Sequence, residues 1–215
     1  DLPKIDLIFA GSPCQGFSSN GKHTGLEHKQ SRLFWEFIRL LRALKPKHFL
    51  LENVSMKQEW RDIISKEVGC EPLRINSSLV SAQSRPRLYW TNIPGVTVPE
   101  DKGLTIFDIL EFPAAPVQPM VTRARKSYCL TATHGNCLGK DGLPIPSEII
   151  HNTKRHQRTC IIHDDHWRML SPVECERLQT VPDGYTSSVT QRQRYRCLGN
   201  GWTVDVIAHL LSFKL

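Results

Sequence analysis

A cysteine and a glutamate each follow a short apolar stretch with the pattern of a buried strand. Cys14 lies in Ser-Pro-Cys-Gln-Gly-Phe, shortly after the apolar residues 5–10, and Glu52 opens Glu-Asn-Val after residues 48–51. A thiolate is a strong nucleophile, and a carboxyl group can hydrogen-bond to, or exchange a proton with, the molecule under attack. The two residue types predict nucleophilic catalysis if the fold brings them together.

The pattern between the two residues predicts how they are positioned. Residues 5–10 are typical of a strand buried on both faces. A helix is expected to follow, with Ser31 as its N-cap and Pro46 ending it. Its apolar residues at helical spacing are Leu33, Phe37, Leu40, Leu41 and Leu44. A strand, helix, strand unit is expected to have parallel strands, and ligands bind at the carboxyl ends of such strands. The cysteine and the glutamate should therefore share one edge of the sheet.

Two arginines add a third candidate group. Arg85 and Arg87 lie in residues 81–87, between strand-like runs at 73–80 and 88–93. Alternate residues of an extended segment face the same side, so both side chains are expected to point at one target. Two permanently charged donors suit a carboxylate, a phosphate or a carbonyl oxygen.

In chain order, these and two later motifs resemble the DNA cytosine-5 methyltransferase family. The five motifs are Pro13-Cys14-Gln15, Glu52-Asn53-Val54, Gln83-x-Arg85-x-Arg87, the run from Arg168 to Gln179, and Gly199-Asn200-x-x-x-Val204. Residues 31–37 and Arg192-Gln193-Arg194 look most like the branch with the animal de novo methyltransferases. Residues 15–18 are closer to bacterial and phage enzymes.

The resemblance implies a mechanism and its catalytic residues. Cys14 would add to carbon 6 of cytosine, and Glu52 would hydrogen-bond ring nitrogen 3 and the exocyclic amine. Arg85 and Arg87 would hold the ring carbonyl oxygen and orient the glutamate. Carbon 5 would then take the methyl group of S-adenosylmethionine. Because these atoms are inaccessible in a stacked duplex, the target base must be flipped out.

The resemblance also implies binding residues. The expected cofactor contacts are Pro13, Asn200, Gly201 and Trp202. The expected DNA contacts are Gln15, Ser18, Asn53, Gln83, Arg123, Arg125 and Lys126. The spacing of the histidines and cysteines between residues 134 and 166 lacks the paired Cys-x-x-Cys pattern, so no metal is expected.

The implied fold is α/β, a Rossmann-like class I methyltransferase domain that is partial, lacking its first strands, with a small irregular target-recognition insertion. Residues 1–95 are expected to form the first catalytic part, 96–165 the target-recognition region and 166–215 the catalytic return. Within the middle segment, residues 104–110 predict a short helix. The closing helix is expected to pack into the core through Val204, Ile207, Ala208 and Leu211.

One feature of the family pattern is not found. The glycine-rich turn and acidic residue that bind the cofactor precede the nucleophile motif in the family, and no Gly-x-Gly here has the required context. We therefore expect a missing N-terminal segment or a partner subunit that carries the glycine-rich cofactor motif. The sheet is expected to have an exposed edge without it.

Composition agrees with a nucleic-acid partner, expected to be double-stranded DNA. The net charge is +7 and the isoelectric point about 9.1, which favours a phosphate-rich ligand. Seven cysteines, an odd number without framework spacing, suggest reduced thiols in an intracellular, DNA-associated protein of the nucleus, cytoplasm or nucleoid. No apolar run is long enough to span a membrane, so no membrane partner is expected.

Alternatives stay open. The same motifs resemble the family's tRNA-methylating branch, and a non-catalytic DNA-binding or regulatory subunit of a split methyltransferase is a third hypothesis. Taken singly, Cys14 is more often a small buried residue, Glu-Asn a turn or cap, and Arg-x-Arg a solvated pair. The target sequence, the host and biological role, and the oligomeric state do not follow from the sequence.

Overall fold

A computed structural model describes residues 3–13, 33–112, 115–116, 126–132, 159–163 and 166–213. The candidate residues Cys14, Gln15, Ser18, Arg123 and Arg125, and the expected helix cap Ser31, lie outside the described residues. The chain forms two compact units. Unit 1 comprises Asp1–Ile75, Pro86–Val98 and His209–Leu215, and unit 2 comprises Asn76–Arg85 and Pro99–Ala208. The three consecutive functional segments expected from the sequence remain a prediction.

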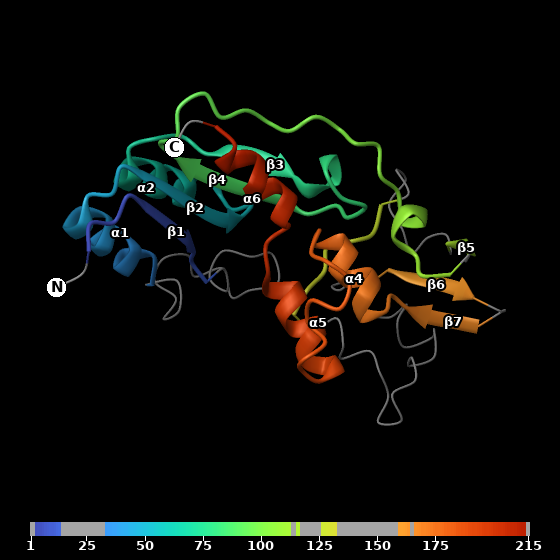
Figure 1. Cartoon of the computed structure of the whole chain (residues 1–215). Coiled ribbons are helices and arrows are strands. Elements are labelled where there is room, and N and C mark those ends of the chain that lie inside the picture. Colours follow the sequence, from blue (N-terminus) through green and yellow to red (C-terminus); the bar gives the residue numbers. More distant parts are fainter. Residues whose placement is uncertain are drawn as a thin grey trace. The chain divides into compact units, whose positions relative to one another are not determined.

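Unit 1 is built on a four-stranded sheet in the order β1-β2-β4-β3 (Figure 1). Its strands are β1 (Leu7–Gly11), β2 (His48–Val54), β4 (Pro86–Thr91) and β3 (Leu73–Asn76). The predicted parallel pairing of β1 and β2 is confirmed, with Gly11 opposite Glu52, and β4 runs antiparallel to β2. Only the first half of the run at 73–80 is a strand, because Asn76 caps the 3-10 helix η2 (Ser77–Leu79) by accepting a hydrogen bond from the Ser78 N–H.

Two helices pack on one face of this sheet. They are α1 (Leu33–Leu44) and α2 (Gln58–Val68), which ends at the left-handed Gly69. Their buried side chains form one core with alternate residues of β2 and β4. The core consists of Phe34, Phe37, Ile38, Phe49, Leu51, Ile64, Leu88 and Trp90. Glu52, next to Leu51 in β2, consequently points to the opposite face.

Two sequence expectations about unit 1 are corrected. The buried face of α1 is formed by Phe34, Phe37 and Ile38, whereas Leu33 is 52% exposed and Leu40 is also exposed. The helix carries apolar residues on more than one stripe, so spacing alone could not choose its face. β1 is not buried on both faces, because Ile8 and Ala10 pack against the core whereas Phe9 between them is 43% exposed.

Unit 2 joins short helices to a three-stranded antiparallel sheet of order β5-β6-β7 (Figure 1). The strands are β5 (Ala115–Pro116), β6 (Cys160–His163) and β7 (His166–Met169). The helices are η3 (Ile106–Ile109), α4 (Pro172–Leu178), α5 (Gln191–Asn200) and the first part of α6 (Val204–Leu211). The short helix expected within residues 104–110 is therefore confirmed as one 3-10 turn. A core around Leu130, Leu170, Leu178 and Leu198 joins η3, β6, α4 and α5.

The closing helix has the predicted position but a different buried face. Val206 and Leu210 are its fully buried residues, whereas Val204 and Ala208 are exposed. The sequence Val-Asp-Val-Ile-Ala-His-Leu-Leu is apolar on both sides, so periodicity could not decide between them.

The sequence pattern did not lead us to expect α2 or α5. Trp60 and Ile64, four residues apart, followed by Gly69 as a C-cap, were the available signal for α2. Among the residues that the structure describes, no helix combines the length and apolar character needed to cross a membrane.

Candidate active site

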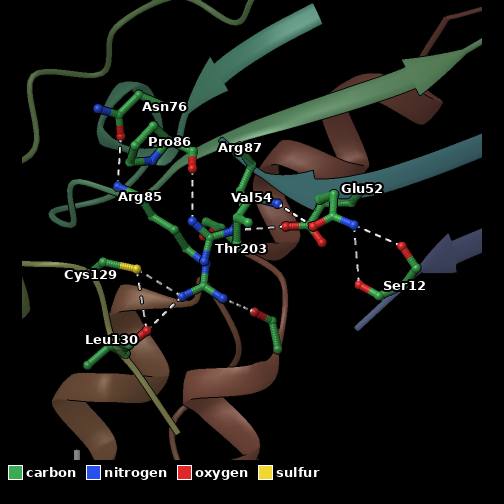
Figure 2. Close-up of polar contacts among 12 residues, drawn as sticks. Ser12, Glu52, Val54, Asn76, Arg85, Pro86, Arg87, Cys129, Leu130 and Thr203 are labelled. Carbon is green, nitrogen blue, oxygen red and sulfur yellow. Dashed lines mark hydrogen bonds and ion pairs between the residues drawn. The ribbon is translucent and has the colours of Figure 1, made fainter. Parts of the chain in front are cut away.

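Glu52 and Arg87 form an ion pair at the end of β2. Arg87 Nε lies 2.9 Å from Glu52 Oε1, and the two side chains are only 14% and 11% exposed (Figure 2). Arg87 Nη1 also donates to the Pro86 carbonyl at 2.8 Å. The strands set this geometry, since Glu52 faces Tyr89 across the β2–β4 ladder and Arg87 faces Val54. The result is a largely buried carboxylate whose orientation is fixed by a neighbouring cation.

Asn53 connects this strand end to the chain that leads to Cys14. Its side-chain amide donates to Ser12 Oγ at 2.8 Å and to the Ser12 carbonyl at 3.4 Å (Figure 2). Asn53 is 1% exposed, so its amide anchors the protein backbone, which differs from the expected contact with DNA. Ser12 lies immediately before Pro13 and two residues before Cys14. The hydrogen bond from Asn53 therefore links the start of the nucleophile motif to the glutamate motif. The Cys14 thiol itself lies outside the described residues.

Arg85 has different partners from Arg87. Its guanidinium donates from Nη1 to the Leu130 carbonyl at 2.8 Å, and from Nη2 to the carbonyls of Gly201 at 2.8 Å and Gly199 at 3.2 Å. The expectation that both arginines point at one target is therefore not met by these contacts. Arg85 is the last residue of a loop, and its N–H donates to the Asn76 side chain. Arg87 lies inside β4, which begins at Pro86. Because only one of the two arginines belongs to the strand, the alternation of side chains along a strand does not place them on the same side.

Gln83, another expected DNA contact, is buried and bound to protein groups. It is 0% exposed, and its amide donates to the Leu178 carbonyl and to Gln179 Oε1 while accepting from the Leu130 N–H. Gln179 in turn accepts from Thr203 Oγ1 at 2.9 Å. These side chains form a buried amide network in unit 2.

Lys126 also differs from its expected role. Its ammonium group donates to the carbonyls of Ser78 at 2.7 Å and Ser81 at 3.2 Å, and the residue is 7% exposed. Burial lowers the pKa of this amine, which nearby Asp101 and Asp108 partly oppose. In this arrangement Lys126 contacts two carbonyls of the 78–81 loop, and its role in DNA binding stays a prediction.

The expected cofactor residues Gly201 and Trp202 lie in the turn between α5 and α6. Both line a cavity of about 280 Å³ together with Val181, Tyr185, Leu198 and Ile207, among others. Asn200, the last residue of α5, is exposed and does not line it. The cavity is mainly apolar and carries a tryptophan, which suits a planar or cationic organic group such as the adenine or sulfonium of S-adenosylmethionine.

Gln179 and Thr203 were not predicted as site residues, although Gln179 is the last residue of the fourth motif. A glutamine inside an otherwise apolar run before a proline was the only signal, and it does not reveal the partners. Within the residues described here, no group of three potential metal ligands comes together.

The family model for C-5 cytosine-specific DNA methylases matches residues 1–63 and 81–212. Among curated relatives, the type II methyltransferase M.HpaII of Haemophilus parainfluenzae is 27% identical over 252 residues, covering 95% of this chain and 70% of that protein. M.HhaI of Haemophilus parahaemolyticus is 25% identical, covering 97% of this chain and 75% of that protein.

Solved structures show the same fold. The Entamoeba histolytica methyltransferase EhMeth aligns with a TM-score of 0.63 and 19% identity over 96% of this chain and 76% of its own. The Schizosaccharomyces pombe Dnmt2 methyltransferase aligns with a TM-score of 0.56 and 19% identity over 96% of this chain and 77% of its own. The expected Rossmann-like class I methyltransferase fold is thereby confirmed.

Proposed function

The chain belongs to the C-5 cytosine-specific DNA methylase family, whose members use S-adenosylmethionine, and from this premise we propose that it methylates carbon 5 of cytosine in double-stranded DNA through a covalent adduct with Cys14. The observation that supports this most is the arrangement at the end of β2. Glu52 is held by Arg87, while Asn53 holds Ser12, two residues before Cys14. A flipped cytosine placed there meets a nucleophile, a hydrogen-bonding carboxyl group and a cation.

The Cys14 thiolate forms a bond to carbon 6 of the base, and the carbon 5–carbon 6 double bond supplies electrons that make carbon 5 nucleophilic. Glu52 stabilises the charge that develops at ring nitrogen 3, and the Arg87 guanidinium fixes the glutamate and places a positive charge near the ring carbonyl oxygen. When bound, S-adenosylmethionine would supply the methyl group to carbon 5, with cleavage of its sulfur–methyl bond and release of S-adenosylhomocysteine. Loss of the carbon 5 proton to a base then expels the Cys14 thiolate and restores the aromatic ring.

Gly201 and Trp202 would contact the cofactor, with Asn200 and Pro13 nearby in the family pattern. The apolar cavity beside Trp202 supports this assignment, because an aromatic face binds a planar ring or a sulfonium cation. The turn offers backbone groups for the polar part of the molecule.

A further polypeptide carrying the glycine-rich cofactor motif would complete the site, either as another segment of the same protein or as a partner subunit. The outer edge of β1 supports this proposal, since β1 ends the described sheet and Phe9 is 43% exposed. A parallel strand added there would extend the described sheet beyond β1. The protein would act inside the cell, on DNA.

The first test uses a duplex containing 5-fluorocytosine and labelled S-adenosylmethionine. Fluorine at carbon 5 prevents the elimination step, so an adduct that depends on the methyl donor should accumulate at Cys14 in the complete enzyme, meaning this chain together with the cofactor-motif polypeptide. Cys14→Ser should abolish adduct and turnover with little loss of DNA affinity. Turnover near the wild-type level in that variant would remove Cys14 from the mechanism.

The alternative substrate is transfer RNA. The positive net charge of the chain favours binding to DNA and to RNA alike. The same assay with folded RNA in place of the duplex therefore distinguishes the two substrates. Methyl transfer to RNA alone would overturn the DNA assignment and leave the cysteine chemistry intact. DNA binding without any adduct would favour the regulatory alternative.

A further inference from the structure

Two buried side chains bind the same backbone carbonyl in the turn between α5 and α6. The Gly201 carbonyl accepts from Arg85 Nη2 at 2.8 Å and from Gln179 Nε2 at 3.3 Å, and the Gly201 N–H donates to the Cys197 carbonyl at 2.8 Å. The two peptide groups that flank Gly201 are therefore fixed. The second of them carries the N–H of Trp202.

Arg85 joins this turn to a second segment of unit 2. The same guanidinium binds the carbonyls of Gly199 and Leu130 and lies 3.3 Å from Cys129 Sγ. Its own backbone is held on both sides, since its N–H donates to Asn76 Oδ1 at 2.8 Å and its carbonyl accepts from the Ser77 N–H at 3.1 Å. With 4% exposure, Arg85 has the geometry of a clamp on main-chain carbonyls.

Gln179 is anchored equally well. Its Nε2 also donates to the Leu198 carbonyl at 2.5 Å, and its Oε1 accepts from Thr203 Oγ1 at 2.9 Å and Gln83 Nε2 at 3.1 Å. Both ends of the amide are therefore held by the protein. A buried side chain with all its partners satisfied specifies one arrangement of the groups that it binds.

We propose that Arg85 and Gln179 are positioning residues for cofactor binding, which set the backbone of Gly201 and Trp202 in the conformation that receives S-adenosylmethionine. This inference rests on the proposed function, because that function assigns the turn to the cofactor. It separates the two arginines of the third motif: Arg87 acts beside the reacting base through Glu52, and Arg85 acts on the cofactor turn through its main-chain carbonyls.

The test measures cofactor affinity and the single-turnover methylation rate separately in the complete enzyme. Arg85→Lys keeps the charge but cannot reproduce the guanidinium fork. It should weaken S-adenosylmethionine binding, followed by tryptophan fluorescence, by about tenfold or more, the equivalent of one lost hydrogen bond in affinity. KM for S-adenosylmethionine should rise in parallel. The single-turnover methylation rate at saturating cofactor should stay within a few fold of wild type.

Two further variants provide a control and an independent test. Arg196→Lys changes an exposed arginine of α5 and should leave cofactor affinity at the wild-type value. Thr203→Val removes one hydrogen bond to Gln179 and should weaken cofactor binding severalfold. If Arg85→Lys does not fold, Thr203→Val decides, and unchanged affinity there would show the proposal to be wrong.

Other outcomes are also distinct. Wild-type cofactor affinity in Arg85→Lys, together with a collapsed rate at saturating cofactor, would place Arg85 at the reacting base and overturn the proposal. Failure of the wild-type complete enzyme to bind S-adenosylmethionine would instead overturn the proposed function.

Discussion

Neighbouring residues of β2 serve two tasks because a strand alternates its side chains. Glu52 turns to the face where Arg87 binds it, and Asn53 turns the other way and binds Ser12. The dipeptide therefore fixes both the carboxyl group and the start of the chain toward Cys14. A shift of one residue in the register between β1 and β2 would move Ser12 away from Asn53 and so uncouple the segment toward Cys14 from Glu52.

Replacing Glu52 tests the first task. Glu52→Gln keeps the shape of the side chain but removes the charge that pairs with Arg87 and the carboxyl that stabilises the attacked ring. We expect the single-turnover rate of methyl transfer to fall by about 10²- to 10⁴-fold, with DNA affinity close to wild type. Rapid-quench measurement of labelled methyl transfer checks this.

Glu59→Gln, an exposed glutamate of α2, is the matched control and should transfer methyl groups at the wild-type rate. An unchanged rate in Glu52→Gln would remove Glu52 from its proposed role.

At the scale of elements, a buried carboxylate of α4 organises the loop before α5. Glu176 is 0% exposed and accepts from the N–H groups of Gly184 at 2.7 Å and Thr186 at 2.8 Å, from the Thr186 hydroxyl, and from Arg194 Nη2 at 2.9 Å. Burial favours the neutral acid, but the hydrogen bonds from Thr186, Arg194 and Gly184 outweigh it, so the pKa of Glu176 lies below its ordinary value of 4.5.

This lowered pKa predicts a pH-dependent stability. A carboxyl whose pKa is lower in the folded state stabilises the fold above its unfolded pKa, and the contribution is lost as pH falls through the folded value. Glu176→Gln should reduce the free energy of unfolding at pH 7 by about 1–3 kcal/mol. The difference from wild type should shrink below about pH 4.5, as denaturant titrations at several pH values can show.

Glu36→Gln removes a carboxylate of an exposed pair with Arg39 and should change stability by less than about 1 kcal/mol. A difference between Glu176→Gln and wild type that stays constant from pH 7 to pH 3 would contradict the assigned ionisation.

The close approach of α5 to residues 131–132 gives a second prediction at this scale. A Cβ atom on Gly199 would lie 2.2 Å from the Thr131 carbonyl carbon and 2.4 Å from the Ala132 nitrogen, both backbone atoms. Although alanine is the better helix former, Gly199→Ala should lower the free energy of unfolding by about 1–3 kcal/mol or more. Thermal unfolding measures the change.

Arg196→Ala, at an exposed position of the same helix, should be neutral or slightly stabilising. A stabilised Gly199→Ala protein would show that the helix and the 131–132 segment do not pack this closely.

For the whole molecule, the net charge of +7 predicts electrostatic binding to nucleic acid. Affinity for duplex DNA should fall linearly on a log–log plot against salt concentration, with a slope of about −0.9 for each phosphate that is neutralised. Because the Lys126 ammonium is buried on two carbonyls, Lys126→Met should leave that slope unchanged while reducing thermal stability. Fluorescence anisotropy at several salt concentrations provides the measurement, and a slope reduced by about one would return Lys126 to the DNA interface.

The sequence alone determined the family and part of the frame, and it supplied the proposed chemistry. Motifs in order pointed to Cys14, Glu52 and Arg87 as catalytic candidates, and short apolar runs predicted β1, β2 and their parallel pairing. The family could be predicted for the same reason, since each motif is local in the sequence and the five occur in family order.

Tertiary structure alone decided which groups the polar side chains of these motifs contact. Three polar residues are of types that often bind ligands, namely Arg85, Gln83 and Lys126. In the structure they are buried and donate hydrogen bonds to backbone carbonyls of unit 2 that are distant in the sequence. The buried faces of α1 and α6 were undecided for a related reason, because both helices are apolar on more than one side. Hydrogen-bond partners and packing faces depend on contacts between segments far apart in the chain, which local spacing does not encode.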